Sequence, residues 1–325
     1  MKTRRDVLAL AAGLAPLPLV GTGTPVIAQA PWPAKPVRIV IGFPPGGGLD
    51  TLMRVLLPVL ASRLGANVFI ENKPGAVGTI GNNLVATSAP DGYTFLATVV
   101  ASYTTTVKMI KVPYDALRDL PPVAIIATGG QAFIASTTSK FKSLNDVFDF
   151  ARARPGVVNF GIIGKGTQDH IAGEFLRREQ NVKWEYIPFN STTGIFQALM
   201  GGDIHLTCMS YSLILQHIQA GTTVALAVAG KDPSPFLPGV PAAGLPRHVS
   251  DYTYVIAGPR GLPEGIATRL HQALAETLAE PAIQTELKDR SLSSLVFSPE
   301  DSARTIAEET AAIAPMLASM DLRIE

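Results

Sequence analysis

The chain of 325 residues contains only one cysteine, Cys208. A single cysteine excludes an intramolecular disulfide, so the folded state must be held together by its apolar core. Cys208 lies in the strand-like segment "DIHLTCMS" (203–210). We interpret it as a buried core residue and not as a catalytic thiol, because reactive cysteines need an accessible, electropositive setting.

The sequence also lacks an excess of charge of either sign. Lysine and arginine number 27 against 26 aspartate and glutamate residues, a net charge of +1. Such a balance offers no general attraction to nucleic acid or to an anionic membrane. After residue 30, no uncharged apolar run approaches the length of about 18 residues that a transmembrane helix needs. We therefore expect no binding to nucleic acid and no membrane span in that part of the chain. We also expect the protein to be a monomer.

Signatures of catalysis and of metal binding are scarce as well. The histidines show neither H-x-x-x-H nor H-E-x-x-H spacing, and no G-x-S-x-G segment is present. The segment "GIIGKGTQDH" (161–170) is not a phosphate-binding P-loop, because Gly166 separates Lys165 from Thr167. We predict no metal, no cofactor and no catalytic residues. The pair Asp169–His170 stays open as an alternative acid–base dyad, although helix capping and packing explain it more simply.

The first 30 residues have the composition of an export signal. Basic residues near the start are followed by an apolar stretch from Val7 to Val20 and by an Ala-x-Ala site ending at Ala30. The segment "TRRDVLA" is similar to a twin-arginine signal, although Val7 and Ala9 depart from that pattern. We predict export to the periplasm with cleavage near Ala30, and favour the twin-arginine route over the general secretory route.

Apolar, β-rich runs alternate with helical patterns along the rest of the chain. Most runs are continuously apolar, which is typical of parallel strands covered on both faces, and the alternation predicts an α/β protein with parallel sheets. The predicted strands are Val37–Phe43, Val68–Glu71, Thr94–Ser102, Val123–Ala135, Val157–Ile163, Trp184–Pro188, Ile204–Ser210, Val224–Ala229 and Tyr252–Gly258.

Two of these strands end in glycine-rich turns that lead into helices. In "IGFPPGGGLD" (41–50), Gly46, Gly47 and Gly48 can expose backbone N–H groups to a small anion, and Asp50 is placed to cap the helix. In "GIIGKGTQDHIAGEFL" (161–176), Thr167 can cap the next helix or offer its hydroxyl to a ligand. The pattern predicts two junctions that hold opposite ends of one anion. A bare turn or a nucleotide loop remains the alternative for the first.

The long run Val123–Ala135, broken at Gly129–Gly130, suggests a crossing between two lobes. The run Tyr252–Gly258 would bring the chain back. We predict that residues 31–130 and 252–325 form lobe 1 and that residues 131–251 form lobe 2.

Several motifs together resemble one family. They are "WPAKPVRIVIGFPPGGGLD" (32–50), "ENKPGAVGTIG" (71–81), "APDGYTFL" (89–96), "FGIIGKGTQDHIAGE" (160–174), "GGDIHL" (201–206) and "AGTTVALAV" (220–228). In this order they are similar to the Bug-type, TctC-like periplasmic solute receptors, which deliver substrates to tripartite tricarboxylate transporters. The resemblance covers nearly all of the chain after residue 30.

The resemblance implies a two-lobed type II periplasmic binding protein with its ligand, a small carboxylate, in the cleft between the lobes. It implies that the turns Phe43–Asp50 and Gly164–Gln168 hold the ligand, with residues near 102, 189 and 210 close by. The predicted ligand-binding residues are Phe43, Pro45, Gly46, Gly47, Gly48, Leu49, Asp50, Ser102, Tyr103, Gly164, Lys165, Gly166, Thr167, Gln168, Phe189, Ser210 and Tyr211.

Departures from the family pattern bear on the choice of ligand. Leu49 stands where a small or hydroxyl residue is usual, and Ser210–Tyr211 replaces a more polar pair. These changes favour an aromatic or longer-chain mono- or dicarboxylate over citrate. The membrane components of a tripartite tricarboxylate transporter are the expected partners. A sensor partner of a two-component system, or an exported α/β enzyme acting on carboxylates, remains the alternative.

Overall fold

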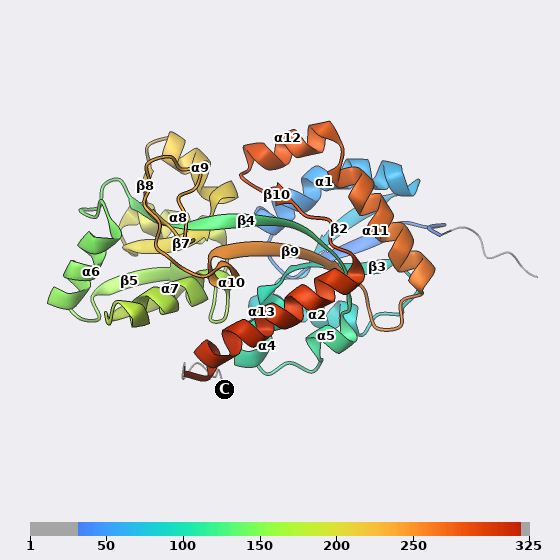
Figure 1. Cartoon of the computed structure of the whole chain (residues 1–325), viewed down its shortest axis with the longest axis horizontal. Coiled ribbons are helices and arrows are strands. Elements are labelled where there is room, and N and C mark those ends of the chain that lie inside the picture. The colour runs from blue at the N-terminus through green and yellow to red at the C-terminus, as the bar shows by residue number, and fades with distance from the viewer. Residues whose placement is uncertain (1–31, 320–325) are drawn as a thin grey trace, which may run out of the picture. The chain divides into compact units, whose positions relative to one another are not determined.

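The computed structural model describes residues 32–319, so the predicted export signal lies outside the described residues. Six strands form the first sheet. Figure 1 shows how they are arranged. Within it β1 pairs in parallel with β2 and β3, and the order continues through β9 to the first part of β4. These strands are β1 (Val37–Ile41), β2 (Val68–Asn72), β3 (Thr94–Val99), β4 (Pro122–Ser136), β9 (Asp251–Ala257) and the short β10 (Ser293–Ser294).

The second sheet begins where β4 leaves the first. The second part of β4 pairs antiparallel with β7 and β8, and β5 pairs in parallel with β6 and β7. The added strands are β5 (Val158–Ile162), β6 (Trp184–Pro188), β7 (Leu206–Ser210) and β8 (Thr223–Val228). The α/β prediction is confirmed, and each of the nine predicted runs overlaps one of these strands. The predicted parallel sheets are present only in part, because β4 and β9 run antiparallel to their neighbours through the middle of the fold.

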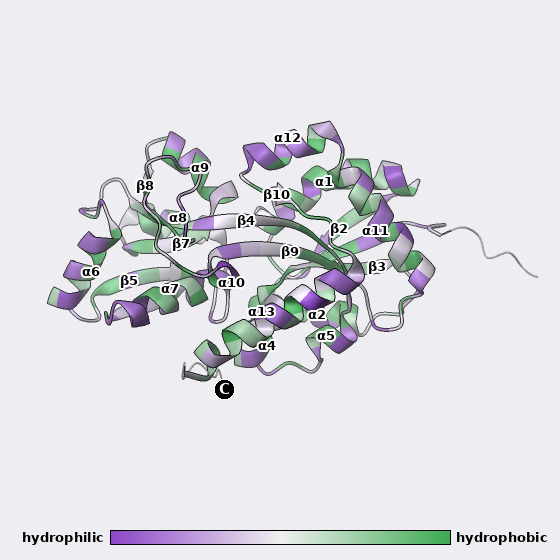
Figure 2. Cartoon of the chain, in the orientation of Figure 1, coloured by the Kyte–Doolittle hydropathy of each residue, from purple (hydrophilic) through white to green (hydrophobic). Residues whose placement is uncertain are grey.

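Helices cover both sheets. Figure 2 shows hydrophilic residues (purple) and hydrophobic residues (green) mixed along α11, α12 and α13, as expected for helices that pack one apolar face against a sheet. The helices around the first sheet are α1 (Gly48–Leu64), η1 (Ala76–Gly78), α2 (Thr79–Ala86), α3 (Ala101–Thr104), α4 (Thr106–Met109), α5 (Ala116–Asp119), α11 (Glu264–Leu278), α12 (Pro281–Asp289) and α13 (Pro299–Ser319). Those around the second are α6 (Leu144–Ala153), α7 (Gln168–Glu179), α8 (Thr192–Gly201), α9 (Tyr211–Gln219) and α10 (Arg247–Ser250).

Apolar side chains gather in separate clusters on the two sheets. Leu52, Phe95 and Ile256 belong to a cluster on the first sheet, and Phe133 and Phe160 to one on the second. Helix α13 contributes to two clusters, because Ile306 is buried in a further cluster of the first sheet, with Val40 and Leu96, and Ile313 is buried in the cluster of the second sheet. The lobe boundaries stay a prediction. Among residues 32–319, no helix combines the length and apolar character needed to cross a bilayer.

The exit from β1 is packed so closely that only glycine fits. A Cβ atom on Gly42 would lie 2.5 Å from the carbonyl oxygen of Gly78 and 2.7 Å from its Cα. Both are backbone atoms, which cannot rotate away as a side chain could. This contact fixes the point at which the chain turns from β1 into the glycine-rich loop.

The first prediction concerns this contact. We expect Gly42→Ala to lower the free energy of unfolding by about 1–3 kcal/mol, because the added methyl group forces backbone apart in a packed interior. Urea denaturation measures the change. Gly265→Ala is the matched control, since a Cβ there meets no atom within 4 Å and alanine suits a helix. Equal stability of both variants would contradict the close approach.

Candidate functional site

One cavity of about 120 Å³ lies where four strands lead into helices. The carboxyl ends of β1, β5, β6 and β7 are followed by the N-termini of α1, α7, α8 and α9. The lining includes the residue before or at the start of each helix: Gly47, Thr167, Ser191 and Ser210. Ligands of α/β sheets bind at such strand ends, because helix N-termini present free N–H groups and a partial positive charge.

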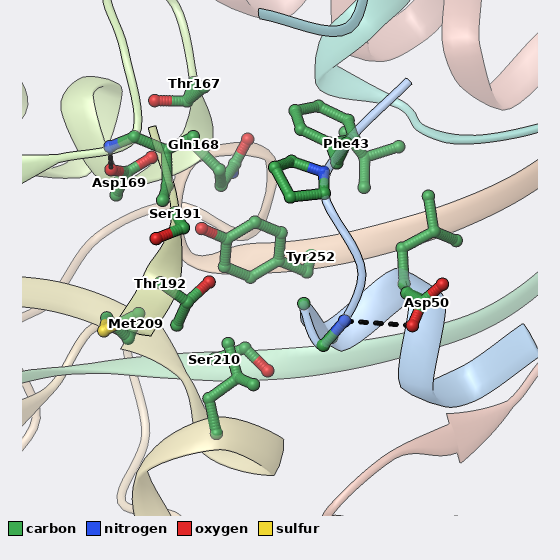
Figure 3. Close-up of a pocket in the computed structure, with 18 of the residues that line it drawn as sticks. Phe43, Asp50, Thr167, Gln168, Asp169, Ser191, Thr192, Met209, Ser210 and Tyr252 are labelled. Atoms are coloured by element: carbon green, nitrogen blue, oxygen red, sulfur yellow. Dashed lines mark hydrogen bonds between the residues drawn. The ribbon is translucent and has the colours of Figure 1, made fainter. Parts of the chain in front are cut away.

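The first loop contributes Phe43 to Asp50 to the lining (Figure 3). Gly46 has a φ of +85°, the left-handed region that favours glycine. Gly47 is extended and is the N-cap of α1, and the first helical bond runs from the Thr51 N–H to the Gly47 carbonyl. The N–H groups of Gly48 and Leu49 therefore precede the helical ladder and are free for a ligand.

The predicted N-cap role of Asp50 is wrong, because α1 begins two residues earlier, at Gly48. The buried Asp50 carboxylate instead accepts hydrogen bonds from Gly46 N at 3.0 Å, from Arg54 Nε at 2.8 Å and from Asn72 Nδ2 at 3.0 Å. Burial by itself would raise the pKa of Asp50, but the bonds from Arg54, Gly46 and Asn72 together lower it. Asp50 therefore fixes the loop as an anion whose charge Arg54 balances.

A group of hydroxyls faces Gly48 from the other side of the cavity. A Cβ on Gly48 would lie 3.1 Å from the Tyr254 hydroxyl and 3.4 Å from Ser212 Oγ, so glycine keeps this space open. Ser210 and Ser212 hydrogen bond to each other at 2.6 Å. The Tyr254 hydroxyl is buried and has no hydrogen-bond partner among residues 32–319. Burial raises the pKa of Tyr254 to about 12, so this group is a neutral donor at physiological pH.

The second loop has the same plan with different internal bonds. Thr167 is the N-cap of α7, as predicted, but its hydroxyl donates to the Gly164 carbonyl at 2.5 Å. Gly166 has a φ of +87°, and its carbonyl oxygen accepts a bond from Thr105 Oγ1 at 2.8 Å. The second loop is thereby tied to the segment that follows β3.

The carboxyl group of Asp169 lines the cavity and is almost fully buried, at 2% exposed. Its Oδ2 accepts a hydrogen bond from Ile163 N at 2.7 Å, whereas Oδ1 has no partner within the described part of the chain. Burial raises the pKa of Asp169 from 3.8 to about 6, and the nearby Thr167 hydroxyl and backbone amides only partly oppose this. A buried carboxylate with an unsatisfied oxygen is costly to maintain.

The alternative Asp169–His170 dyad is not assembled. His170 Nδ1 accepts a hydrogen bond from Gly166 N at 3.0 Å, and its ring packs edge-on against Tyr186. Burial lowers the pKa of His170 to about 4, so the ring is neutral. Among residues 32–319, no cluster of histidine, cysteine and acidic side chains is arranged to hold a metal ion.

Most of the predicted ligand-binding residues lie together in the lining. They are Phe43, Pro45, Gly46, Gly47, Gly48, Leu49, Asp50, Ser102, Thr167, Gln168 and Ser210. Gln168 is also tied down by its side chain, which donates to the His248 carbonyl at 3.1 Å.

The structure does not bring the other predicted residues to the cavity lining. Tyr103 is buried and donates to the Leu120 carbonyl at 2.9 Å, and the Tyr211 ring packs against Gly130. Phe189 packs near Gly161. Gly164 faces Val77, Lys165 is exposed to solvent, and Gly166 lies against Thr106 and Met109.

Sequence reasoning considered Asp169 only as part of a catalytic dyad and not as a ligand-binding residue, and it missed two tyrosines of β9. Tyr252 and Tyr254 line the cavity although they come about 200 residues after the first loop in the chain. Their alternation in "DYTYV" places both on one face of a strand, which is the signal that marks them. Further lining residues are Val99, Ala101, Thr106, Ile163, Thr192, Thr193, Met209 and Leu213.

Similarity to known proteins extends over most of the chain. Residues 52–322 match the family described as tripartite tricarboxylate transporter family receptor. The chain is 29% identical to Protein BugT of Bordetella pertussis over 294 residues, which cover 89% of this chain and 90% of BugT.

Two solved structures of Rhodopseudomonas palustris proteins are similar to this fold. MatC, solved with bound malate, is 27% identical with a TM-score of 0.80, over 86% of this chain and 98% of MatC. Rpa4515, solved with adipate, is 26% identical with a TM-score of 0.83, over 87% of this chain and 96% of Rpa4515.

The second prediction follows from the raised pKa of Asp169. The native state binds this proton more tightly than the unfolded chain, so stability falls as pH rises through about 4 to 6. At pH 7.5 the penalty amounts to at most roughly 3 kcal/mol, from 1.36 kcal/mol per pKa unit. We expect Asp169→Asn to raise the melting temperature of the ligand-free protein at pH 7.5, and to raise it less at pH 4.5. A gain that does not grow with pH would contradict a raised pKa at Asp169.

Proposed function

The chain belongs to the tripartite tricarboxylate transporter family of receptors, of the Bug or TctC type, as its motifs predicted. On this premise we propose that it captures a small organic anion with at least one carboxylate in the cavity described above, and delivers it to the membrane components of a tripartite tricarboxylate transporter. Members of this family are solute-binding receptors and not enzymes.

The observation that carries the proposal is the kind of donor that surrounds the cavity. The N-termini of α1, α7, α8 and α9 converge there, and each offers free N–H groups to an anion. Within the described part of the chain, the lining includes no lysine, arginine or histidine. An anion would be held by backbone amides and by neutral hydroxyls such as those of Tyr252 and Tyr254.

The size of the cavity supports a ligand of modest length. A volume of about 120 Å³ corresponds to on the order of ten water-sized positions. Mono- and dicarboxylates with about eight to ten non-hydrogen atoms fit this space. The proteins solved with malate and adipate carry ligands in this range. Leu49, Val99, Met209 and Leu213 add apolar lining, which suits a longer-chain or aromatic carboxylate.

We further propose that residues 31–130 with 252–325 and residues 131–251 act as two lobes that close on the ligand by bending in β4 and β9. Gly129 and Gly130 of β4 lie opposite Tyr252 and Asp251 of β9, at the point where the two sheets separate. Hinge closure at strand crossings is a common response to ligands in two-lobed receptors. The protein would act in the periplasm as a monomer after removal of residues 1–30.

The third prediction tests carboxylate capture itself. In a thermal-shift screen with millimolar malate, adipate, benzoate and butylamine, at least one carboxylate should raise the melting temperature. The amine should not, because helix N-termini repel a cation. Calorimetric titration would then give the affinity. If none of the carboxylates stabilises or binds the protein, the proposed function is wrong.

The fourth prediction assigns a role to the orphaned hydroxyl of Tyr254. We expect Tyr254→Phe to weaken carboxylate binding about 10–100-fold, because it removes a buried hydroxyl that has no partner in the described chain and lies beside Gly48. Tyr93→Phe is the matched control, since that hydroxyl only accepts a bond from Ala34 N, outside the cavity lining. Calorimetric titration measures the carboxylate affinity of both variants. Equal affinities would show that the Tyr254 hydroxyl does not contribute to binding.

A further inference from the structure

Asp169 is an unexpected residue in a cavity that we propose binds an anion. The lining holds two acidic side chains, and the first, Asp50, is paired with Arg54. Asp169 has no basic partner in the part of the chain that the structure describes. A bare negative charge next to an anionic ligand would oppose binding, unless that ligand also offers something that Asp169 attracts.

One oxygen of the Asp169 carboxyl group, Oδ1, has no hydrogen-bond partner within residues 32–319. Figure 3 shows the carboxyl group with one oxygen bonded to a backbone nitrogen, the Ile163 N–H, while the other lies toward the remaining labelled side chains of the pocket. The Thr167 hydroxyl is close, but its single hydrogen points to the Gly164 carbonyl. Oδ1 is thus a buried acceptor at the cavity wall without a bond, which a ligand could supply.

A structural role does not explain the charge. The bond from Ile163 N holds the second loop against the start of α7, and the amide oxygen of an asparagine would accept it equally well. The second, unpartnered oxygen and the negative charge add only the cost of burial to such a role. A feature that costs stability and lies in a binding cavity is typical of a functional group.

Resting on the proposed function, we propose that Asp169 is the specificity-determining residue for a second group on the ligand. Its Oδ1 accepts a hydrogen bond from a hydroxyl or ammonium group carried by the same molecule whose carboxylate the helix N-termini hold. The ligand class is then a hydroxy- or amino-substituted carboxylate. A plain carboxylate would leave Oδ1 buried against a methylene group and unpaired.

The size of the expected discrimination follows from the penalty for an unpaired buried acceptor. Leaving a buried acceptor without a hydrogen bond costs about 1–3 kcal/mol if the acceptor is neutral and more if it is charged. This cost corresponds to a factor of about 10–100 or greater in affinity. A hydroxyl donor is neutral and an ammonium donor is positively charged. The affinities of the hydroxy and amino ligands are therefore measured separately. The ammonium gains from the ionised carboxylate but is opposed by the helix N-termini.

The fifth prediction compares ligands matched in carbon skeleton. Calorimetry at pH 7.5 is performed with three sets: succinate, malate and aspartate; glutarate, 2-hydroxyglutarate and glutamate; adipate, 2-hydroxyadipate and 2-aminoadipate. We expect a hydroxy or amino member of at least one set to bind tenfold or more tightly than its plain diacid. In Asp169→Asn this preference should fall below about threefold, with the plain diacid bound at least as tightly as before.

The control is Asp203→Asn, which makes the same substitution on an exposed residue outside the cavity lining and should keep the wild-type preference. If plain diacids bind the wild type as tightly as their substituted partners, the role of Asp169 is refuted while carboxylate capture stands. Persistence of the preference in Asp169→Asn also refutes it. If no member of any set binds, this inference is refuted, and the proposed function fails with it only if benzoate also fails to bind in the thermal-shift screen. The wild-type comparison is independent of whether the variant folds.

Discussion

The antiparallel pairing of β4 with β9 is the constraint on which the rest of the fold depends. The first part of β4 pairs with β9, and its second part pairs with β7 and β8, so one strand belongs to both sheets. This arrangement brings the carboxyl ends of β1 and β5 to one cavity, although the two strands never pair. It also places Tyr252 and Tyr254 of β9 in the lining of that cavity. Small changes at the crossing would therefore move every element of the site.

The proposed recognition of an anion without a basic side chain would have a physical advantage. A lysine or arginine in a closed cavity would need a partner whenever the ligand is absent, because an unpaired buried charge is strongly unfavourable. Backbone N–H groups and hydroxyls are neutral, so an empty cavity carries no such penalty. The one fixed acid of the first loop, Asp50, is neutralised by Arg54, whose side chain is largely exposed. The loop thus stays rigid without opposing an incoming carboxylate.

Local patterns made the strands and both glycine-rich junctions predictable, because apolar runs and glycine turns depend on neighbouring residues alone. The role of Asp50 was not predictable, since it depends on Arg54 and on Asn72 of the next strand. Tyr103 and Tyr211 were misplaced for a related reason: an aromatic residue after a strand end can face either the core or the cavity, and only packing decides.

In both glycine-rich junctions a carboxylate fixes the loop to the helix that follows it. The two carboxylates differ in how they use their second oxygen. In each, a carboxylate in the first turn of the helix accepts a backbone N–H from the preceding loop: Asp50 from Gly46, and Asp169 from Ile163. Asp50 uses its other oxygen for Arg54 and Asn72, so both oxygens serve the fold. Asp169 leaves its other oxygen without a partner in the described chain. Because fixing the loop takes only one oxygen, the second is best explained by the ligand, whose binding would return the stability that the buried charge removes.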